Sequence, residues 1–196
     1  MFLTLLSCKN VNRKSDNLIE KDFGLLEKEN DSISVEINLS EFNDWKKLLK
    51  RTEQIVCNDS LPKIIIKKEN TYKNVYLRNP CWEKLTCLLI KEKNILEIHN
   101  DKINKIGNIF YPLDSLPKIL KRDLENNGTN PELSENPEKL VILISYDYNG
   151  IQKLPNTLDK LTSSFEQVTN KNNLKIWLNR KVEVIPLLPP KPTKIE

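Results

Sequence analysis

The apolar run Leu-Val-Ile-Leu-Ile at residues 140–144 constrains the fold of this chain more than any other stretch. A strand with one face in water alternates apolar and polar side chains, whereas this run is apolar on both faces. Such strands lie inside sheets whose two faces are both covered. We therefore predict that residues 140–145 form a central strand.

Strand and helix patterns alternate along the rest of the chain. Period-two or short β-branched runs predict strands at 33–37, 64–66, 72–77, 95–98, 105–111 and 174–178. Apolar residues at helical spacing predict helices that begin after Ser40, at Asn79-Pro80 (ending at Lys93), near Asp114 and at Leu154. Together they predict an α+β fold, a mixed sheet with helices packed mainly on one face. Two similar strand–strand–helix subdomains are one form that this fold could take.

The length of 196 residues suits one medium domain or two small ones. Residues 1–31 are predicted to be a truncated signal and a flexible tether, and residues 32–93 an N-terminal α+β subdomain. Residues 94–179 would form a second α+β subdomain. The proline-rich tail at 180–196 is expected to be extended.

Charge argues against a nucleic-acid partner. Lys and Arg number 31 against 27 Asp and Glu, and the two signs are interspersed. A nucleic-acid surface would show clustered cations with aromatic residues between them. The densest basic stretches, 46–51 and 118–122, are instead interpreted as the polar faces of amphipathic helices.

The first residues, MFLTLLSC, give the one targeting signal. Leu5-Leu6-Ser7-Cys8 resembles the short box that ends bacterial lipoprotein signals. A full signal has a basic start and a longer apolar region. The box is therefore a chance match, or the true start lies upstream of Met1. No apolar stretch is long enough for a membrane span. We expect a lipid on Cys8 to anchor the protein in the bacterial envelope, facing the periplasm.

Three further cysteines bear on the redox compartment. An exported chain could join Cys57 to Cys81 or to Cys87, whereas Cys81 and Cys87 would lie on opposite sides of the predicted helix. Simple buried thiols are the alternative. The spacing of Cys81 and Cys87 does not match a zinc site, so no metal is expected.

The sequence contains few of the motifs that are typical of enzymes. Four glycines form no phosphate-binding loop, and the single histidine, His99, is interpreted as a turn residue. No catalytic residue or cofactor is therefore predicted. Tyr146, Asp147 and Tyr148 follow the central strand at its carboxyl end, where open α/β sheets bind ligands, so they are the candidate binding edge. The alternatives are a polar loop with two half-buried tyrosines, or an enzyme site centred on this run and His99.

Residues 94–179 resemble the periplasmic domain of biopolymer-transport proteins of the ExbD/TolR type. The resemblance rests on the hairpin segments 96–98 and 109–111, the junction Pro-Leu-Asp-Ser-Leu-Pro-Lys-Ile-Leu at 112–120, and the central strand with Asp147 after it. It implies an α+β domain in the envelope. That family also has a membrane helix with an aspartate for proton-driven energy coupling. This chain shows no such helix, so no energy-coupling role is expected.

These observations together predict a non-enzymatic envelope lipoprotein whose domain binds a protein partner or a cell-wall component. The alternative is a cytoplasmic immunity or regulatory protein whose start resembles a lipoprotein signal by chance.

Overall fold

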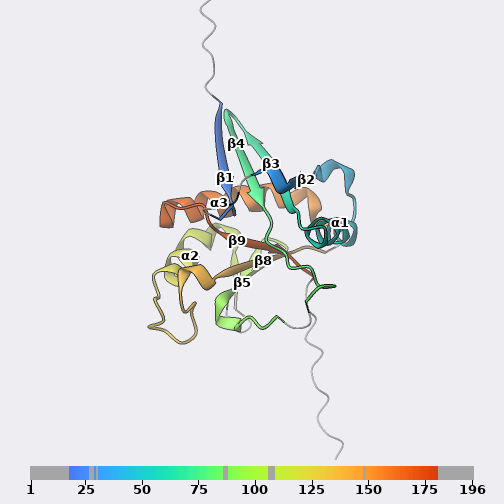
Figure 1. Ribbon diagram of the computed structural model, residues 1–196. Helices are drawn as coiled ribbons and strands as arrows, with labels where there is room; N and C mark the ends of the chain where they lie inside the picture. Colours follow the sequence, from blue (N-terminus) through green and yellow to red (C-terminus); the bar gives the residue numbers. More distant parts are fainter. Residues whose placement is uncertain are drawn as a thin grey trace, which may run out of the picture.

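The structure is a computed structural model that describes residues 18–26, 29, 31–85, 88–105, 109–147 and 149–180. These residues form two mixed β-sheets and three α-helices (Figure 1). The α+β class is therefore confirmed, with two sheets in place of one.

The first sheet has the strand order β1-β4-β3-β2. Its strands are β1 (Ile19–Phe23), β2 (Ser34–Glu36), β3 (Leu61–Lys68) and β4 (Thr71–Tyr76). β3 and β4 form an antiparallel hairpin, and β1 and β2 add to its two edges in parallel. Helix α1 (Trp45–Cys57) connects the parallel strands β2 and β3 and packs on β3. This crossover places α1 beside the first sheet.

The second sheet has the strand order β7-β6-β5-β8-β9. Its strands are β5 (Ile95–His99), β6 (Lys102–Asn104), β7 (Phe110–Pro112), β8 (Val141–Ser145) and β9 (Lys175–Leu178). β8 lies between β5 and β9 and is parallel to both. This position of β8 confirms the prediction of a central strand at 140–145. The physical reason is that a strand with two apolar faces needs cover on both sides.

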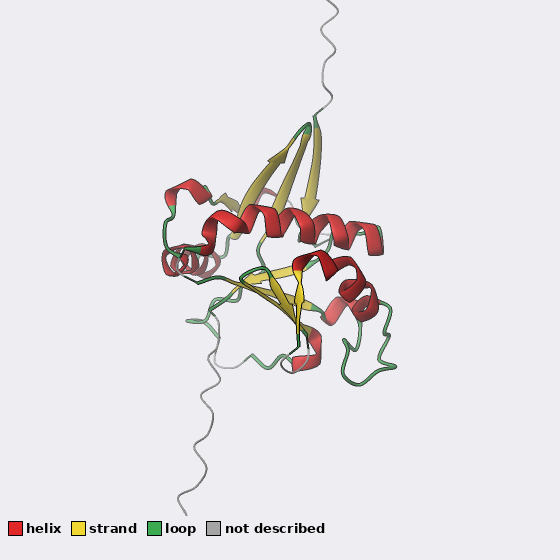
Figure 2. Cartoon of the chain, turned by 180° about the vertical axis from the view of Figure 1, so that it is seen from behind, coloured by secondary structure: helices red, strands yellow, loops and turns green. Residues whose placement is uncertain are grey.

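The two sheets share one hydrophobic core. Helix α3 (Leu154–Thr169) runs between them and packs against helix α2 (Leu116–Leu124), as Figure 2 shows. One cluster of buried side chains includes Ile64 of the first sheet and Ile144 of the second. Leu77 also forms a parallel bridge with Ile176 of β9, so the sheets are joined by backbone as well. The two predicted subdomains therefore meet through a continuous core.

The predicted tether at residues 1–31 is wrong over its last part. Residues 19–23 form β1, and Gly24 follows with a φ of +94°. A Cβ on Gly24 would lie 2.5 Å from the carbonyl oxygen of Tyr76, so this close approach requires glycine. The strand was missed because β1 is polar along an edge and has little apolar alternation.

The helix predicted from Asn79 to Lys93 is also wrong, and with it the idea of two similar strand–strand–helix units. Among the described residues between β4 and β5, only Glu92–Asn94 is helical, as a single 3-10 turn. The apolar side chains that would have formed the buried stripe are exposed, Leu89 most of all. The segment is held instead by the Cys57–Cys81 disulfide and by the Asn79 amide, which bonds to both backbone groups of Leu178.

Smaller differences concern helix and hairpin boundaries. Helix α1 begins later than predicted, because Asp44, and not Ser40, caps it by accepting a hydrogen bond from the Lys46 N–H at 2.9 Å. The hairpin partner of β5 is β6, at residues 102–104, while β7 pairs with β6.

Candidate functional site

The carboxyl ends of β5 and β8 lie side by side and bring His99 next to Ser145. His99 Nδ1 lies 2.9 Å from Ser145 Oγ, and its Nε2 lies 3.1 Å from Asn100 Nδ2 and 3.6 Å from Asp147 Oδ1. The Ser145 side chain is buried, so its hydroxyl cannot reach an external substrate. His99 ends β5 and precedes a turn in which Asn100 has a positive φ. These contacts describe a strand-end hydrogen-bond network.

The predicted binding edge is wrong for Tyr146. This side chain is only 4% exposed, and its hydroxyl hydrogen bonds with Asp101 Oδ1 at 2.5 Å and Thr157 Oγ1 at 2.6 Å. Its ring packs edge-on against Trp45, with ring centroids 5.4 Å apart. Burial and the bond to Asp101 raise the pKa of Tyr146. The residue therefore belongs to the core.

Asp147 is exposed, and its carboxylate accepts a hydrogen bond from Asn100 Nδ2 at 2.6 Å. The third predicted residue, Tyr148, lies outside the described residues. The structure thus leaves Asp147 as the accessible described member of this edge.

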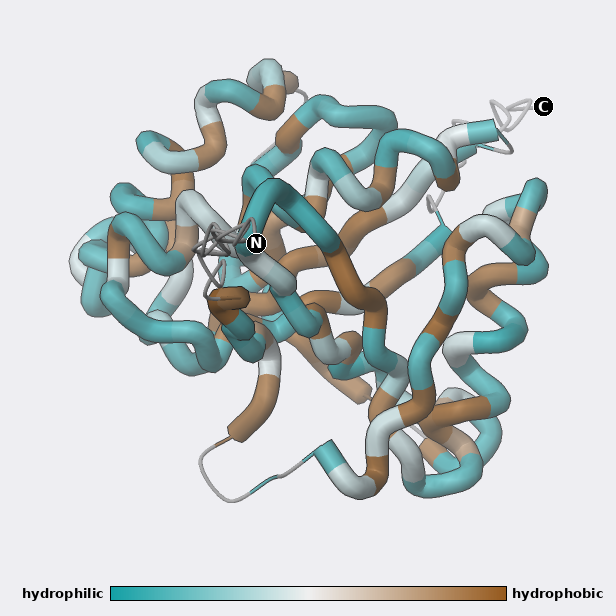
Figure 3. Tube along the Cα trace, turned by 90° about the horizontal axis from the view of Figure 1, so that it is seen from above, coloured by the Kyte–Doolittle hydropathy of each residue, from teal (hydrophilic) through white to brown (hydrophobic). Residues whose placement is uncertain are grey.

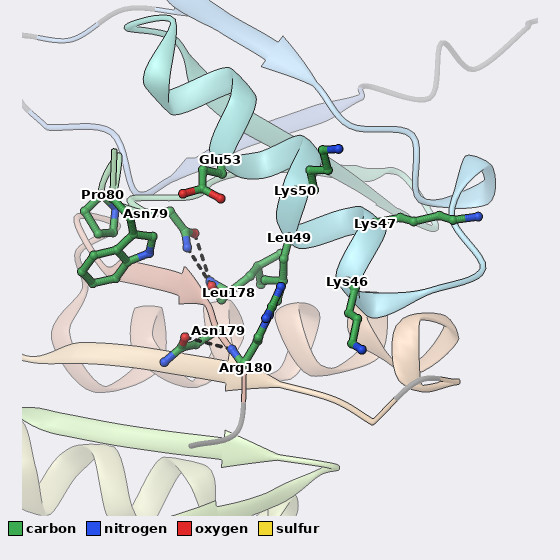
Figure 4. A pocket seen from close by; sticks show the side chains of 11 residues that line it. Lys46, Lys47, Leu49, Lys50, Glu53, Asn79, Pro80, Leu178, Asn179 and Arg180 are labelled. Atoms are coloured by element: carbon green, nitrogen blue, oxygen red, sulfur yellow. Dashed lines mark hydrogen bonds between the residues drawn. The ribbon is translucent and has the colours of Figure 1, made fainter. Parts of the chain in front are cut away.

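A second candidate site is a groove of about 620 Å³ between α1 and the end of β9 (Figure 4). One wall is the exposed face of α1, and the other is formed by residues 79–82 and by the end of β9. The lining side chains are Lys46, Lys47, Leu49, Lys50, Glu53, Asn79, Pro80, Trp82, Leu178, Asn179 and Arg180. A volume of this size is typical of ligand sites.

Side-chain contacts fix the walls of this groove to each other. Trp45 Nε1 of α1 donates to the Asn179 carbonyl oxygen at 2.8 Å. The Asn79 amide bonds to both backbone groups of Leu178, at 2.7 Å to its oxygen and 3.0 Å to its nitrogen. A disulfide joins Cys57, the last residue of α1, to Cys81. The groove is therefore pre-formed.

The disulfide is one of the two pairings expected from the sequence. The Cα atoms of Cys57 and Cys81 lie 4.9 Å apart, within the usual range for a bridge. The other candidate, Cys87, lies outside the described residues, as does the predicted lipid site Cys8.

The groove is cationic and its charge is uneven. Its charged lining residues are four cations, Lys46, Lys47, Lys50 and Arg180, and one anion, Glu53. All four cations are exposed, and within the described part of the chain none of them has an ion-pair partner. In Figure 4 the three lysines fan out from one end of the groove, whereas Glu53, Asn79 and Pro80 gather at the other.

An aromatic surface lies in the same groove. Trp82 is 50% exposed, and its ring meets Trp177 edge-on with centroids 6.3 Å apart. Because the Trp82 ring packs against Trp177 on one side, its exposed part forms an ordered apolar surface next to the cations. Cations and an aromatic face together can bind a ligand that is anionic in one part and uncharged in another.

The sequence interpretation found only half of this site. The basic stretch 46–51 was interpreted as the polar face of an amphipathic helix, and the structure does place Lys46, Lys47 and Lys50 on the exposed side of α1. The opposite wall is far away in sequence, so no local spacing predicts it. The two lysines in the first turn of α1 gave no signal either, because the helix was predicted to begin four residues earlier.

Two further features of the described residues concern metal ligands and membrane spans. In that part of the chain, no group of three or more His, Cys, Asp or Glu side chains could hold a metal ion. No helix there is long and apolar enough to cross a membrane.

Comparison of the chain with protein-family models, curated proteins and solved structures found no match. The resemblance of residues 94–179 to the ExbD/TolR domain therefore stays a prediction.

Proposed function

We propose that this protein is an exported, non-enzymatic binding protein of the bacterial envelope, anchored by a lipid on Cys8. The observation that supports it is the Cys57–Cys81 disulfide. Disulfides persist in secreted and periplasmic proteins, whereas the cytosol keeps thiols reduced. The bridge therefore favours an exported protein over the cytoplasmic immunity or regulatory protein considered as the alternative.

The position of the folded domain fits such an anchor. The first described strand begins at Ile19, so the chain between Cys8 and the fold can span at most about 40 Å. A lipid on Cys8 would hold the domain close to a membrane surface without any membrane helix.

Binding, rather than catalysis, is supported by where the reactive groups lie. The Ser145 and Tyr146 side chains are buried and bonded within the strand-end network, away from external ligands. The groove beside α1 instead offers exposed cations and an aromatic side chain on pre-formed walls. We therefore place the binding of a protein or cell-wall component in the groove.

The lipid anchor is tested by feeding producing cells a fatty-acid analogue and comparing wild type with Cys8→Ala. We expect label on the wild type alone. Absence of label, or equal label on Cys8→Ala, contradicts the anchor.

Export is tested separately by quenching the same cells in acid and alkylating free thiols. Wild type is expected to keep Cys57 and Cys81 protected, and Cys57→Ser to expose the Cys81 thiol. Two alkylated thiols at these positions in the wild type would favour the cytoplasmic alternative.

A further inference from the structure

We infer that the groove between α1 and the end of β9 binds a linear polymer that carries phosphate groups, and the envelope location proposed above makes a non-nucleotide polymer the expected one. This inference rests on the proposed function, because it names the ligand of the proposed binding domain.

The cations of the groove are arranged for an extended anion. Lys46 and Lys50 are one helical turn apart, so they lie on one side of α1 about 6 Å apart along its axis. Arg180 approaches from the opposite wall at the end of β9 and extends toward Leu49 (Figure 4). A chain with repeated negative charges could pass between the walls and contact both.

The first turn of α1 adds positive potential to the same end. Lys46 and Lys47 occupy this turn, which contains no acidic residue. Cations at a helix N-terminus are unfavourable, and here the capping Asp44 carboxylate, which accepts from the Lys46 N–H at 2.9 Å, offsets only part of that effect. No ion pair within the described residues offsets the two lysines. A bound anion would remove this unfavourable feature.

The openness of the site favours a polymer over a small ligand. Its cations are exposed, and the polar side chain that is fixed in its wall, Asn79, is already bonded to Leu178. Such a site recognises its ligand through several charge contacts, as proteins do along phosphate backbones. Lysine ammonium groups are point charges with three donors and suit phosphate without a planar geometry.

Trp82 indicates that the polymer has uncharged units between its phosphates. The ring is half exposed beside the cations and supported by Trp177, so apolar faces of such units could pack on it.

Two observations argue against other occupants of the groove. The position of β1 argues against a membrane lipid, and charge argues against the protein's own C-terminal tail. In Figure 1 the start of β1 lies at the top of the molecule, and the end of β9 lies toward the lower right. The described chain therefore enters the fold on a side of the molecule away from the groove. Residues 181–196 contain three lysines and two glutamates, so they do not complement a basic groove.

The test uses the full 196-residue chain with its disulfide intact. Binding is measured by calorimetry at several salt concentrations. The probes are poly(glycerol phosphate), inorganic polyphosphate, poly-L-glutamate, an oligothymidylate, and vesicles of anionic phospholipid.

The groove variant combines Lys46→Gln, Lys50→Gln and Arg180→Gln. Its matched control combines Lys118→Gln, Arg122→Gln and Lys171→Gln, which are exposed cations elsewhere. Both remove three positive charges.

We expect wild type to bind both phosphate polymers. The groove variant should lose roughly tenfold in affinity, and its salt slope should fall by about 2 to 3. The control variant should stay within about twofold of wild type. A further variant, Trp82→Ala, should weaken binding of poly(glycerol phosphate) and leave binding of polyphosphate unchanged.

Other outcomes overturn the inference. Equal losses in the two triple variants would mean unspecific attraction, and no binding to either phosphate polymer would remove the site. Equal or tighter binding of poly-L-glutamate, oligothymidylate or vesicles would indicate an acidic protein, a nucleic acid or a membrane instead. Because the purified protein is used, these failures are distinguishable from a failure of lipid attachment or export in cells.

Discussion

Lys105 and Asp123 form the most deeply buried ion pair among the described residues, and we predict that Lys105→Met destabilises the protein by about 3 to 5 kcal/mol. Their side chains are 1% and 0% exposed, and Lys105 Nζ lies 2.8 Å from Asp123 Oδ1. The ammonium also donates to the carbonyl oxygens of Lys93 at 2.5 Å and Ile95 at 3.0 Å. Methionine keeps the length of the side chain and removes all three contacts.

The magnitude follows from what remains around Asp123. Its Oδ1 would keep one hydrogen bond, from the Ser134 N–H at 2.9 Å, and its Oδ2 has no partner among the described residues even in wild type. A buried carboxylate without a counter-charge costs several kcal/mol. Burial also lowers the pKa of Lys105 against the opposing effect of Asp123, so desolvation at this site is strong.

The assay is urea unfolding followed by circular dichroism. With a slope of about 2 kcal/mol per molar urea, the midpoint should fall by about 1.5 to 2.5 M. The double variant Lys105→Met/Asp123→Asn should regain about 2 kcal/mol, because asparagine still accepts from Ser134 and has no charge. The control is Lys160→Met, whose exposed pair with Asp114 should contribute less than about 1 kcal/mol. A loss below about 1 kcal/mol for Lys105→Met, or no recovery in the double variant, would refute the reasoning.

Two further predictions concern the disulfide and the response to acid. Replacing both Cys57 and Cys81 by serine should lower the free energy of unfolding by about 3 kcal/mol, because the bridge closes a loop with a sequence separation of 24. Urea unfolding measures this loss of stability. An unchanged midpoint would contradict the expectation. Burial acts to raise the pKa of Asp159, but hydrogen bonds from Lys68 and Lys73 outweigh it and lower the pKa. The stability from Asp159 is therefore present above pH 4 or so and is lost as the pH falls through the lowered value. The stability difference between wild type and Asp159→Asn should shrink below about pH 4, and a constant difference down to pH 2.5 would contradict it.

The sequence predicted those elements whose pattern is set by burial alone. The run at 140–144 is apolar on both faces, and such a strand has few positions other than a sheet interior. The helix at 154–168 was also found, and the structure has α3 at Leu154–Thr169. β1 and the segment after β4 could not be found this way. The first is a polar edge strand, and the second has an apolar helical pattern whose side chains remain exposed.

The candidate site was harder to predict than the fold. The sequence predicted a binding edge of Tyr146, Asp147 and Tyr148 at the carboxyl end of β8, and the structure places His99, Ser145 and Asp147 together there. Nothing in the local sequence shows that Tyr146 points into the core, because that depends on Trp45 and Thr157 from α1 and α3. The groove depends in the same way on contacts between α1 and the end of β9.

The charges of the two shorter helices argue that the groove serves a purpose other than stability. Helix α2 has Lys121 and Arg122 in its last turn, where cations are favourable. Helix α1 has no basic residue in its last turn and two lysines in its first, an unfavourable placement that the Asp44 cap offsets in part. Natural sequences break such local rules mainly at functional sites. If the two lysines had no ligand, replacing them by glutamine should stabilise the protein without loss of binding. A Lys46→Gln/Lys47→Gln variant, compared with wild type for urea stability and for polyanion affinity, therefore decides between these two explanations.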